Sequence, residues 1–340
     1  MTRDLTGRYL GLDVRCCLIA SSSPLTASLD GVRRLEDHGI GAVVLPSLLE
    51  ADIDRDLGEV EALALAGAGS PEVCGGFLPG PAHGPGAMER ILELAGRAAS
   101  ALDVPVVASL HAYSDGGWSD LAQCLEQAGA AAIELNLYEA ALDPGETGKA
   151  VEARALSTVR RVRAAVSIPL AVKLSPFYSN LGHMALAIQD AGADGLSLFN
   201  RPHLADIDLV RLRLRTCVAL SRRGEMGLPM LWIAALHGRT KASLAATTGV
   251  ESADDVIRYL LAGSDTVMTA SALLRHGPEY TAVLVAGMKS WLDARGFSSV
   301  GDIRGRLAHA AATVAERGFG AALGSECWSA SAVGLDHTGA

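Results

Sequence analysis

The stretch "AGAAAIELNL", residues 128 to 137, decides the fold. It opens on the end of an amphipathic helical pattern, where Gly129 can adopt the left-handed conformation that closes a helix. Three large apolar residues then alternate with Glu134 and Asn136, which is the pattern of a short buried strand that ends beside an amide side chain. The stretch therefore predicts a unit made of a helix, a glycine junction and a strand.

This unit recurs along the chain. The junction returns at 191–193 ("AGA") and 262–264 ("AGS"), each time before another apolar run. Strands that alternate with helices predict right-handed crossovers and a parallel sheet, and eight units close a (β/α)8 barrel with its active residues at the C-terminal strand ends. An open doubly wound sheet is the alternative, but no G-x-G-x-x-G motif follows the first strand. The eight expected strands lie at 18–21, 42–47, 106–110, 133–137, 170–174, 195–200, 244–249 and 266–271.

Two segments interrupt the repeat. Residues 66–86 are dense in Gly and Pro and predict an insertion after the second strand, either a lid or a surface loop. Residues 228–236, "LPMLWIAAL", are interpreted as an extra strand between the sixth and seventh barrel strands. We expect one barrel domain over residues 1–318 and a frayed tail over 319–340.

Composition narrows the function. The 340 residues carry a formal charge of −9, which argues against nucleic acid as a partner. No secretory signal and no apolar stretch long enough to span a bilayer are found, so no membrane partner and a cytoplasmic location are expected. The 6 cysteines show no metal-ligand spacing, which predicts reduced thiols and no metal.

Polar residues gather at the C-terminal ends of the expected strands. Lys173 is the most informative of them, because a buried ammonium is costly without a negative partner. That partner is a phosphate, a carboxylate or a reduced ring system, and a structural ion pair with an acid on a neighbouring strand is the plainest alternative. The inventory comprises 21–23, Ser47, Ser109, His111, Asn136, Lys173, Ser175, Asn200, 247–249 and 269–271.

The last two strands end in small residues that suit a phosphate. "TTG" and "TAS" allow close approach, the helix near Ser252 adds a favourable dipole, and barrels commonly bind phosphate here. A flat phosphorylated cofactor across the barrel mouth is thus expected, and FMN fits. Asn136 and Asn200 would bind its pyrimidine edge, and Lys173 would stabilise negative charge near N1. Pyridoxal phosphate is less favoured as the cofactor, because a single lysine is the only feature of the sequence that supports a Schiff-base site.

An ordered series of segments is similar to the class 1 dihydroorotate dehydrogenases and the related dihydroorotate dehydrogenase-like flavin barrels. It includes "YLGLDVRCCLIASSSPL", "IELNL", "LAVKLSPFY", "GLSLFNR" and "LAATTGVESADDVIRYLLAGSDTVMTASALL". The resemblance implies an FMN barrel. It places around the cofactor Ala20, Ser21, Ser47, Asn136, Lys173, Asn200, Gly238, Thr248, Gly249, Ala270 and Ser271.

The sequence departs from that family at the turn after the fourth strand. Family enzymes carry an "SCPN" type turn whose Cys or Ser acts as base, and here residues 138–141 read Tyr-Glu-Ala-Ala. Pro46 replaces a common lysine, and Thr248 and Ala270 replace glycines of the phosphate site. The dehydrogenation that the resemblance implies needs a base to remove a proton as hydride leaves for flavin N5.

Three side chains are candidates for this proton transfer. Glu139 under an apolar cover would have a raised pKa, although it can equally point to solvent. Tyr138 is a second candidate, or else packs on the cofactor. His111, at the end of the third strand, is the third. Lys173 is the fourth residue that we place in the chemistry, through its charge.

The leading hypothesis is an FMN-dependent oxidoreductase acting on CH–CH groups, in pyrimidine metabolism, with a small dihydropyrimidine-like or carboxylated substrate. The alternative is a barrel that has lost this chemistry and is a non-redox lyase or isomerase working through Lys173, or a subunit that binds a phosphorylated ligand. Related barrels pair as homodimers or with electron-transfer subunits, so a homodimer and an electron-transfer partner are both expected.

Overall fold

Eight parallel strands form a closed barrel in the computed structural model, which describes residues 3–49, 86–111, 118–137, 141–201, 204–217 and 219–308. The strand order around the barrel is β11-β12-β3-β4-β5-β6-β7-β8, so the (β/α)8 prediction is confirmed. The barrel strands are β3 (Leu18–Ala20), β4 (Ala42–Leu49), β5 (Val106–His111), β6 (Ala132–Leu137), β7 (Leu170–Leu174), β8 (Gly195–Leu198), β11 (Ser243–Ala246) and β12 (Thr266–Thr269).

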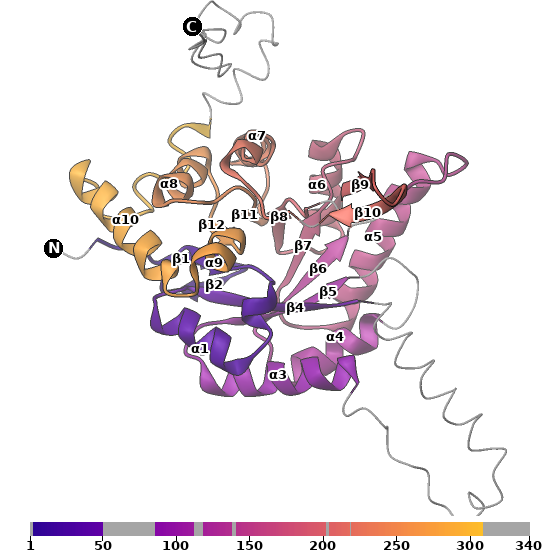
Figure 1. Ribbon diagram of the computed structural model, residues 1–340, viewed down its shortest axis with the longest axis horizontal. Coiled ribbons are helices and arrows are strands. Elements are labelled where there is room, and N and C mark those ends of the chain that lie inside the picture. Colours follow the sequence, from indigo (N-terminus) through magenta and orange to yellow (C-terminus); the bar gives the residue numbers. More distant parts are fainter. Residues whose placement is uncertain are drawn as a thin grey trace, which may run out of the picture.

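Helices surround this barrel on its outside (Figure 1). They follow the strands in the alternation that the sequence predicts, and short 3₁₀ turns add to them. The helices are α1 (Leu29–Asp37), α3 (Ala87–Ala101), α4 (Trp118–Gln127), α5 (Gly148–Ala165), α6 (Leu181–Asp190), α7 (Gly227–Leu236), α8 (Ala253–Ala262), α9 (Ser271–His276) and α10 (Tyr280–Ala294), with 3₁₀ turns η1 (Pro24–Thr26) and η3 (Arg223–Glu225).

The two faces of each strand have different surroundings, as β6 illustrates. Ile133 and Leu135 belong to the large apolar core between the strands and the helices, whereas Ala132 belongs to a smaller cluster inside the barrel. Side chains alternate along a strand, so Glu134 and Asn136 share the inner face with Ala132. This alternation brings polar side chains into the barrel interior near the C-terminal ends of the strands.

An N-terminal hairpin closes the other end. Strands β1 (Gly7–Tyr9) and β2 (Leu12–Val14) pair antiparallel, and Tyr9 with Leu10 packs against the inner apolar cluster. The barrel interior is therefore apolar near this hairpin and polar at the C-terminal mouth. Such a mouth is where barrels place their chemistry.

Residues 228–236 form most of helix α7, so the prediction of an extra strand there is wrong. An unbroken apolar run does not distinguish a buried helix from a buried strand, and α7 packs its apolar sides against neighbouring helices and strands. The extra strands lie instead just before it, as the antiparallel ribbon of β9 (Leu204–Asp208) and β10 (Arg213–Cys217).

Several expectations fall outside the described residues. They include the Gly/Pro-rich insertion at 66–86, apart from Gly86, and the tail at 319–340, so the domain boundary at 318 stays a prediction. None of the helices in the described ranges combines the length and apolarity needed to cross a bilayer.

Candidate functional site

Two hydroxyls and an amide meet at the mouth on the β4, β5 and β6 side. The Oγ atoms of Ser47 and Ser109 lie 2.7 Å apart, and Asn136 Nδ2 donates to them at 2.9 and 3.0 Å. Asn136 is buried, and its Oδ1 has no hydrogen-bond partner. If the amide nitrogen and oxygen of Asn136 were exchanged, the oxygen would accept from the serines and the nitrogen would lack a partner. One polar atom of Asn136 therefore has no hydrogen-bond partner in either orientation.

A second chain of contacts crosses the barrel interior beside the first. Lys173 Nζ lies 3.3 Å from Glu134 Oε1 and 3.4 Å from Ser21 Oγ, and Ser197 Oγ donates to Glu134 Oε2 at 3.0 Å. The Glu134 side chain is 0% exposed and that of Lys173 only 10%. Both carboxylate oxygens thus have partners, and the pair satisfies the requirement that a buried charge be compensated.

A buried tyrosine lies near this ion pair. Burial, and then the nearby Glu134 carboxylate, raises the pKa of the Tyr9 phenol, which therefore stays neutral below the pair. Glu134 and Asn136 share one face of β6, and Asn136 pairs in register with Lys173 on β7. The strand pairing itself brings the amide and the ammonium to one level.

The turn after β11 has an unusual backbone. Thr248 has φ +76° and Gly249 has φ +79°, and a β-branched residue rarely adopts this left-handed region. The hydroxyl of Tyr259 on α8 holds the turn by donating to the carbonyl oxygens of Thr248, at 2.7 Å, and Thr247, at 2.9 Å. Burial raises the pKa of the Tyr259 phenol, so it remains a donor.

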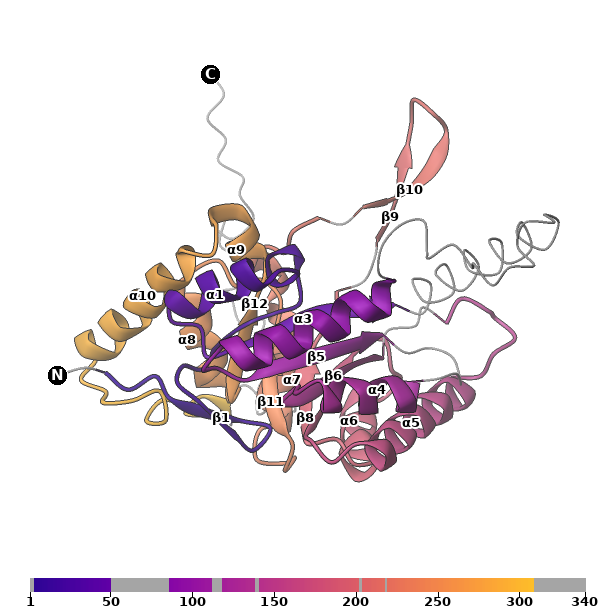
Figure 2. The same ribbon diagram turned by 90° about the horizontal axis from the view of Figure 1, so that it is seen from below.

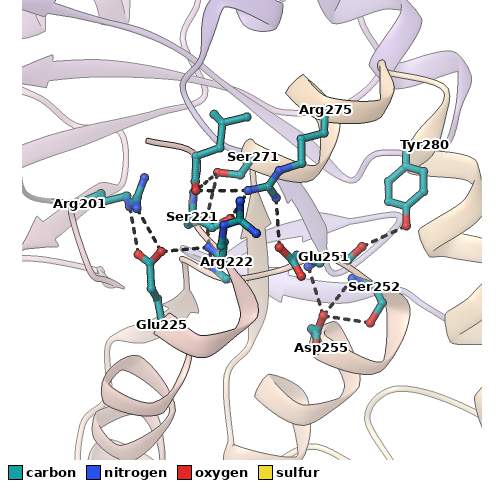
Figure 3. Close-up of polar contacts among 12 residues, drawn as sticks. Arg201, Ser221, Arg222, Glu225, Glu251, Ser252, Asp255, Ser271, Arg275 and Tyr280 are labelled. Atoms are coloured by element: carbon teal, nitrogen blue, oxygen red, sulfur yellow. Dashed lines mark hydrogen bonds and ion pairs between the residues drawn. The ribbon is translucent and has the colours of Figure 1, made fainter. Parts of the chain in front are cut away.

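The segment that carries Ser221 lies beside Ser271 and Arg275 of α9 (Figure 3). Ser221 Oγ accepts from Gly249 N at 3.1 Å and donates to Ser271 Oγ at 2.9 Å, while Ser221 N donates to the same Ser271 Oγ at 3.0 Å. Arg275 fixes this segment by donating to the Ser221 carbonyl oxygen at 2.6 Å and pairs with Glu251 at 3.3 Å. The groups expected to bind phosphate are therefore joined through Ser221.

The structure brings most of the predicted site residues to this mouth. Ala20 ends β3 and directly precedes Ser21. His111 ends β5 and pairs in register with Asn136. Asn200 follows β8, where its backbone N–H donates to the Leu174 carbonyl oxygen. Ala270 lies at the junction between β12 and α9.

Gly238 is the exception. It follows α7 and precedes β11, so it lies at the N-terminal end of the barrel, where it lines a cavity of about 520 Å³ with Arg8, His237 and Lys241. The expectation that it contacts the cofactor was wrong, because the loop that precedes a strand lies at the opposite end from the loop that follows it. Tyr138 and Glu139 lie outside the described residues.

Comparison with known proteins identifies the family. The family model described as "Dihydroorotate dehydrogenase" matches residues 81–292, well over half of the chain. The chain belongs to the dihydroorotate dehydrogenase family.

Individual relatives agree with this assignment. A protein of Aeropyrum pernix, provisionally named dihydroorotate dehydrogenase A (fumarate), is 34% identical over 59% of this chain and 67% of its own. The catalytic subunit of dihydroorotate dehydrogenase B (NAD(+)) of Halalkalibacterium halodurans is 29% identical over 60% and 68%. Dihydroorotate dehydrogenase A (fumarate) of Lactobacillus delbrueckii subsp. bulgaricus is 26% identical over 61% and 68%.

Sequence reasoning about this dihydroorotate dehydrogenase family member missed four residues of the mouth. Glu134 compensates the charge of Lys173, Ser197 donates to Glu134, Ser221 joins the turn to α9, and Tyr259 holds the strained backbone. A signal existed for Glu134, since an acid inside an apolar strand and two residues before Asn136 must share its face. Ser221 carries no such signal, because it lies in a loop far along the chain from its partners.

Proposed function

We propose that this chain is an FMN-dependent oxidoreductase that moves a hydride between FMN and a small dihydropyrimidine-like or carboxylated substrate. The observation that carries the proposal is the unsatisfied amide atom of Asn136 beside the buried ammonium of Lys173, both at the C-terminal mouth of a closed barrel. Buried polar atoms are nearly always paired, so an unpaired one at a barrel mouth marks a ligand position.

The residues on the β6 and β7 side fit the ring end of FMN. The Asn136 amide matches the donors and acceptors of a pyrimidine edge, and the Ser47 and Ser109 hydroxyls hold it in place. Lys173 would stabilise the negative charge that collects on the ring, and Glu134 fixes its ammonium. When bound, FMN would supply the hydride acceptor, which no side chain can provide.

The residues on the β11 and β12 side fit the phosphate end. Gly249 N–H and the Ser221 and Ser271 hydroxyls are donors of the kind that bind phosphate oxygens. The Gly249 N–H now donates to Ser221 Oγ, an acceptor that a phosphate oxygen can replace. Thr248 and Gly249 bend the backbone tightly here.

Proton transfer is assigned to a side chain at the same mouth. Among the described residues, His111 is the candidate, since it ends β5 next to Asn136. Glu139 and Tyr138 stay predictions. Activity distinguishes Glu139 from His111, because only the substitution that removes the acting base, Glu139→Gln or His111→Gln, should slow turnover by about 100-fold or more. Electrons would leave to a diffusible acceptor or to a partner chain.

An absorbance spectrum of the purified full chain, before and after adding FMN, tests the proposal. We expect a flavin spectrum that anaerobic dihydroorotate or a related dihydropyrimidine bleaches. Lys173→Ala should bind FMN but bleach at least about 100-fold more slowly, the scale of one lost electrostatic contact to the reacting centre. The exposed Lys149→Ala is the matched control. If the purified chain is colourless and does not bind added FMN, the proposal is contradicted and the non-redox alternative is favoured.

A further inference from the structure

A cavity of about 520 Å³ lies at the N-terminal end of the barrel, opposite the mouth. Its walls come from the β1–β2 hairpin, from the start of β11 and the loop before it, and from single residues before β12 and after α10. Figure 2 shows this hairpin at the end of the barrel away from the β9–β10 ribbon. Small-molecule sites have volumes of about 300–1,000 Å³, so the cavity is large enough for a ligand.

The lining of this N-terminal cavity is positively charged. Arg8, Lys241 and Arg304 contribute three positive charges and Asp265 one negative charge, which gives a net charge of +2 with His237 neutral. The whole chain carries a formal charge of −9. Positive side chains therefore gather at one place on an acidic chain, and such a local excess attracts anions.

The single carboxylate of the lining is already engaged through both of its oxygens. Asp265 Oδ2 accepts from the backbone N–H of Leu244 at 2.7 Å, and Oδ1 pairs with the Arg304 guanidinium. Asp265 therefore holds Arg304 in place and has no oxygen left for the other two cations.

Arg8 and Lys241 have no carboxylate partner among the described residues. Arg8 Nε donates to the Gly11 carbonyl oxygen at 3.2 Å, which bends the side chain back over the hairpin turn. Asp13 lies opposite Arg8 in the hairpin, but it neither forms an ion pair with Arg8 nor lines the cavity. The charges of Arg8 and Lys241 are thus available to a bound anion.

His237 forms a fixed wall of the cavity. Its Nδ1 donates to the Gly263 carbonyl oxygen at 3.0 Å. A Cβ added at Gly263 would lie 2.5 Å from the imidazole Cγ, and one added at Gly305 would lie 2.1 Å from Nε2. The two glycines therefore enclose the ring and leave it one position. A wall that does not move on binding lowers the entropic cost of holding a ligand.

We propose that the N-terminal cavity binds a small phosphate monoester, with the phosphate held by Arg8 and Lys241 beside Arg304. A phosphate monoester carries about two negative charges at pH 7, which matches the net charge of the lining, whereas a single carboxylate would neutralise only half of it. Guanidinium groups bind phosphate oxygens through paired hydrogen bonds, and a lysine adds a point charge. The remaining volume accommodates the organic part of the ester.

Isothermal titration calorimetry of the full chain tests the proposal, with adenosine monophosphate and glycerol phosphate as probes. We expect both to bind, and adenosine, which lacks the phosphate, not to bind. Lys241→Ala and Arg8→Ala should each raise the dissociation constant at least about 10-fold, as for one lost charged hydrogen bond. Lys149→Ala, which removes an exposed lysine of α5, is the matched control and should leave the dissociation constant unchanged.

A variant at the mouth separates this proposal from the proposed function. Ser221→Ala should leave binding at the N-terminal cavity unchanged, because Ser221 lies at the other end of the barrel. Binding that is lost in Ser221→Ala but kept in Lys241→Ala would place the phosphate at the mouth and overturn the proposal. Failure of both probes to bind, or binding that Lys241→Ala and Arg8→Ala both retain, would also overturn it. None of these outcomes depends on whether the chain holds FMN.

Discussion

Replacing Glu134 by glutamine is expected to lower the free energy of unfolding by about 3 kcal/mol, because it leaves the buried Lys173 ammonium without its counter-charge. The Glu134 side chain is fully buried, and Lys173 Nζ lies 3.3 Å from Oε1. The substitution keeps the size of the side chain and removes only the charge. It therefore isolates the electrostatic contribution of this pair.

The magnitude follows from what remains around Lys173. Removing one member of a buried ion pair costs about 3–5 kcal/mol. The glutamine Oε1 still accepts a hydrogen bond from Nζ, the second acceptor Ser21 Oγ stays in place, and the Lys173 side chain is 10% exposed. These features place the loss at the lower end. Lys173→Met should cost more, because it leaves a carboxylate that is 0% exposed without its cation.

Urea unfolding at pH 7 measures both variants and their combination. Glu134→Gln with Lys173→Met removes both charges, and we expect it to be destabilised by far less than the sum of the two single changes. Glu93→Gln, which breaks the surface pair with Arg97, is the control and should cost less than about 0.5 kcal/mol. If Glu134→Gln costs no more than Glu93→Gln, or if the two single losses simply add, the ion pair does not compensate Lys173.

Three other substitutions probe the mouth and the barrel ends. Thr248→Gly should raise the free energy of unfolding by about 0.5–1 kcal/mol in urea, because relief of the left-handed backbone exceeds the entropy cost of glycine; a loss of stability would contradict this. Tyr259→Phe should lower it by about 1–2 kcal/mol, since the Thr247 and Thr248 carbonyls lose a buried donor, and an unchanged urea midpoint would refute that. The Ser167 hydroxyl, followed by backbone amides, lowers the pKa of Glu126, so this carboxylate stabilises the fold above its ordinary pKa and the contribution is lost as pH falls through the lowered value. Glu126→Gln should therefore show a shallower fall in Tm on acidification below about pH 5, and a pH profile parallel to the wild type would disprove it.

The barrel strands were predictable because their physical signal is local. A strand covered on both faces must be apolar at nearly every position, and a glycine junction marks where the preceding helix ends. The expected strand at 170–174 coincides with β7. The expected strand at 266–271 is two residues shorter as β12, because Ser271 begins α9 and Ala270 precedes it.

The errors came from segments whose signal is ambiguous or unusual. The apolar run at 228–236 is equally consistent with a buried helix and a buried strand. Its proline at 229 is tolerated in the first turn of α7. The ribbon at 204–217 does alternate with period two, with Asp206 and Asp208 on one side of β9 and Arg213 on the same side of β10. It was not identified because its apolar face has no cover in the described chain.

Lys173 shows why the site was only half predictable. From the sequence, the partner of its ammonium could be a phosphate, a reduced ring system or a carboxylate. In the structure the partner is the Glu134 carboxylate. The ion pair does not exclude a ligand, because a lysine ammonium has three donors and the described residues accept from two of them, at Ser21 and Glu134. Lys173 also pairs in register with Asn136 at the mouth. The ion pair therefore leaves one donor of Lys173 for a bound molecule, and a structural role and a catalytic role for Lys173 are compatible.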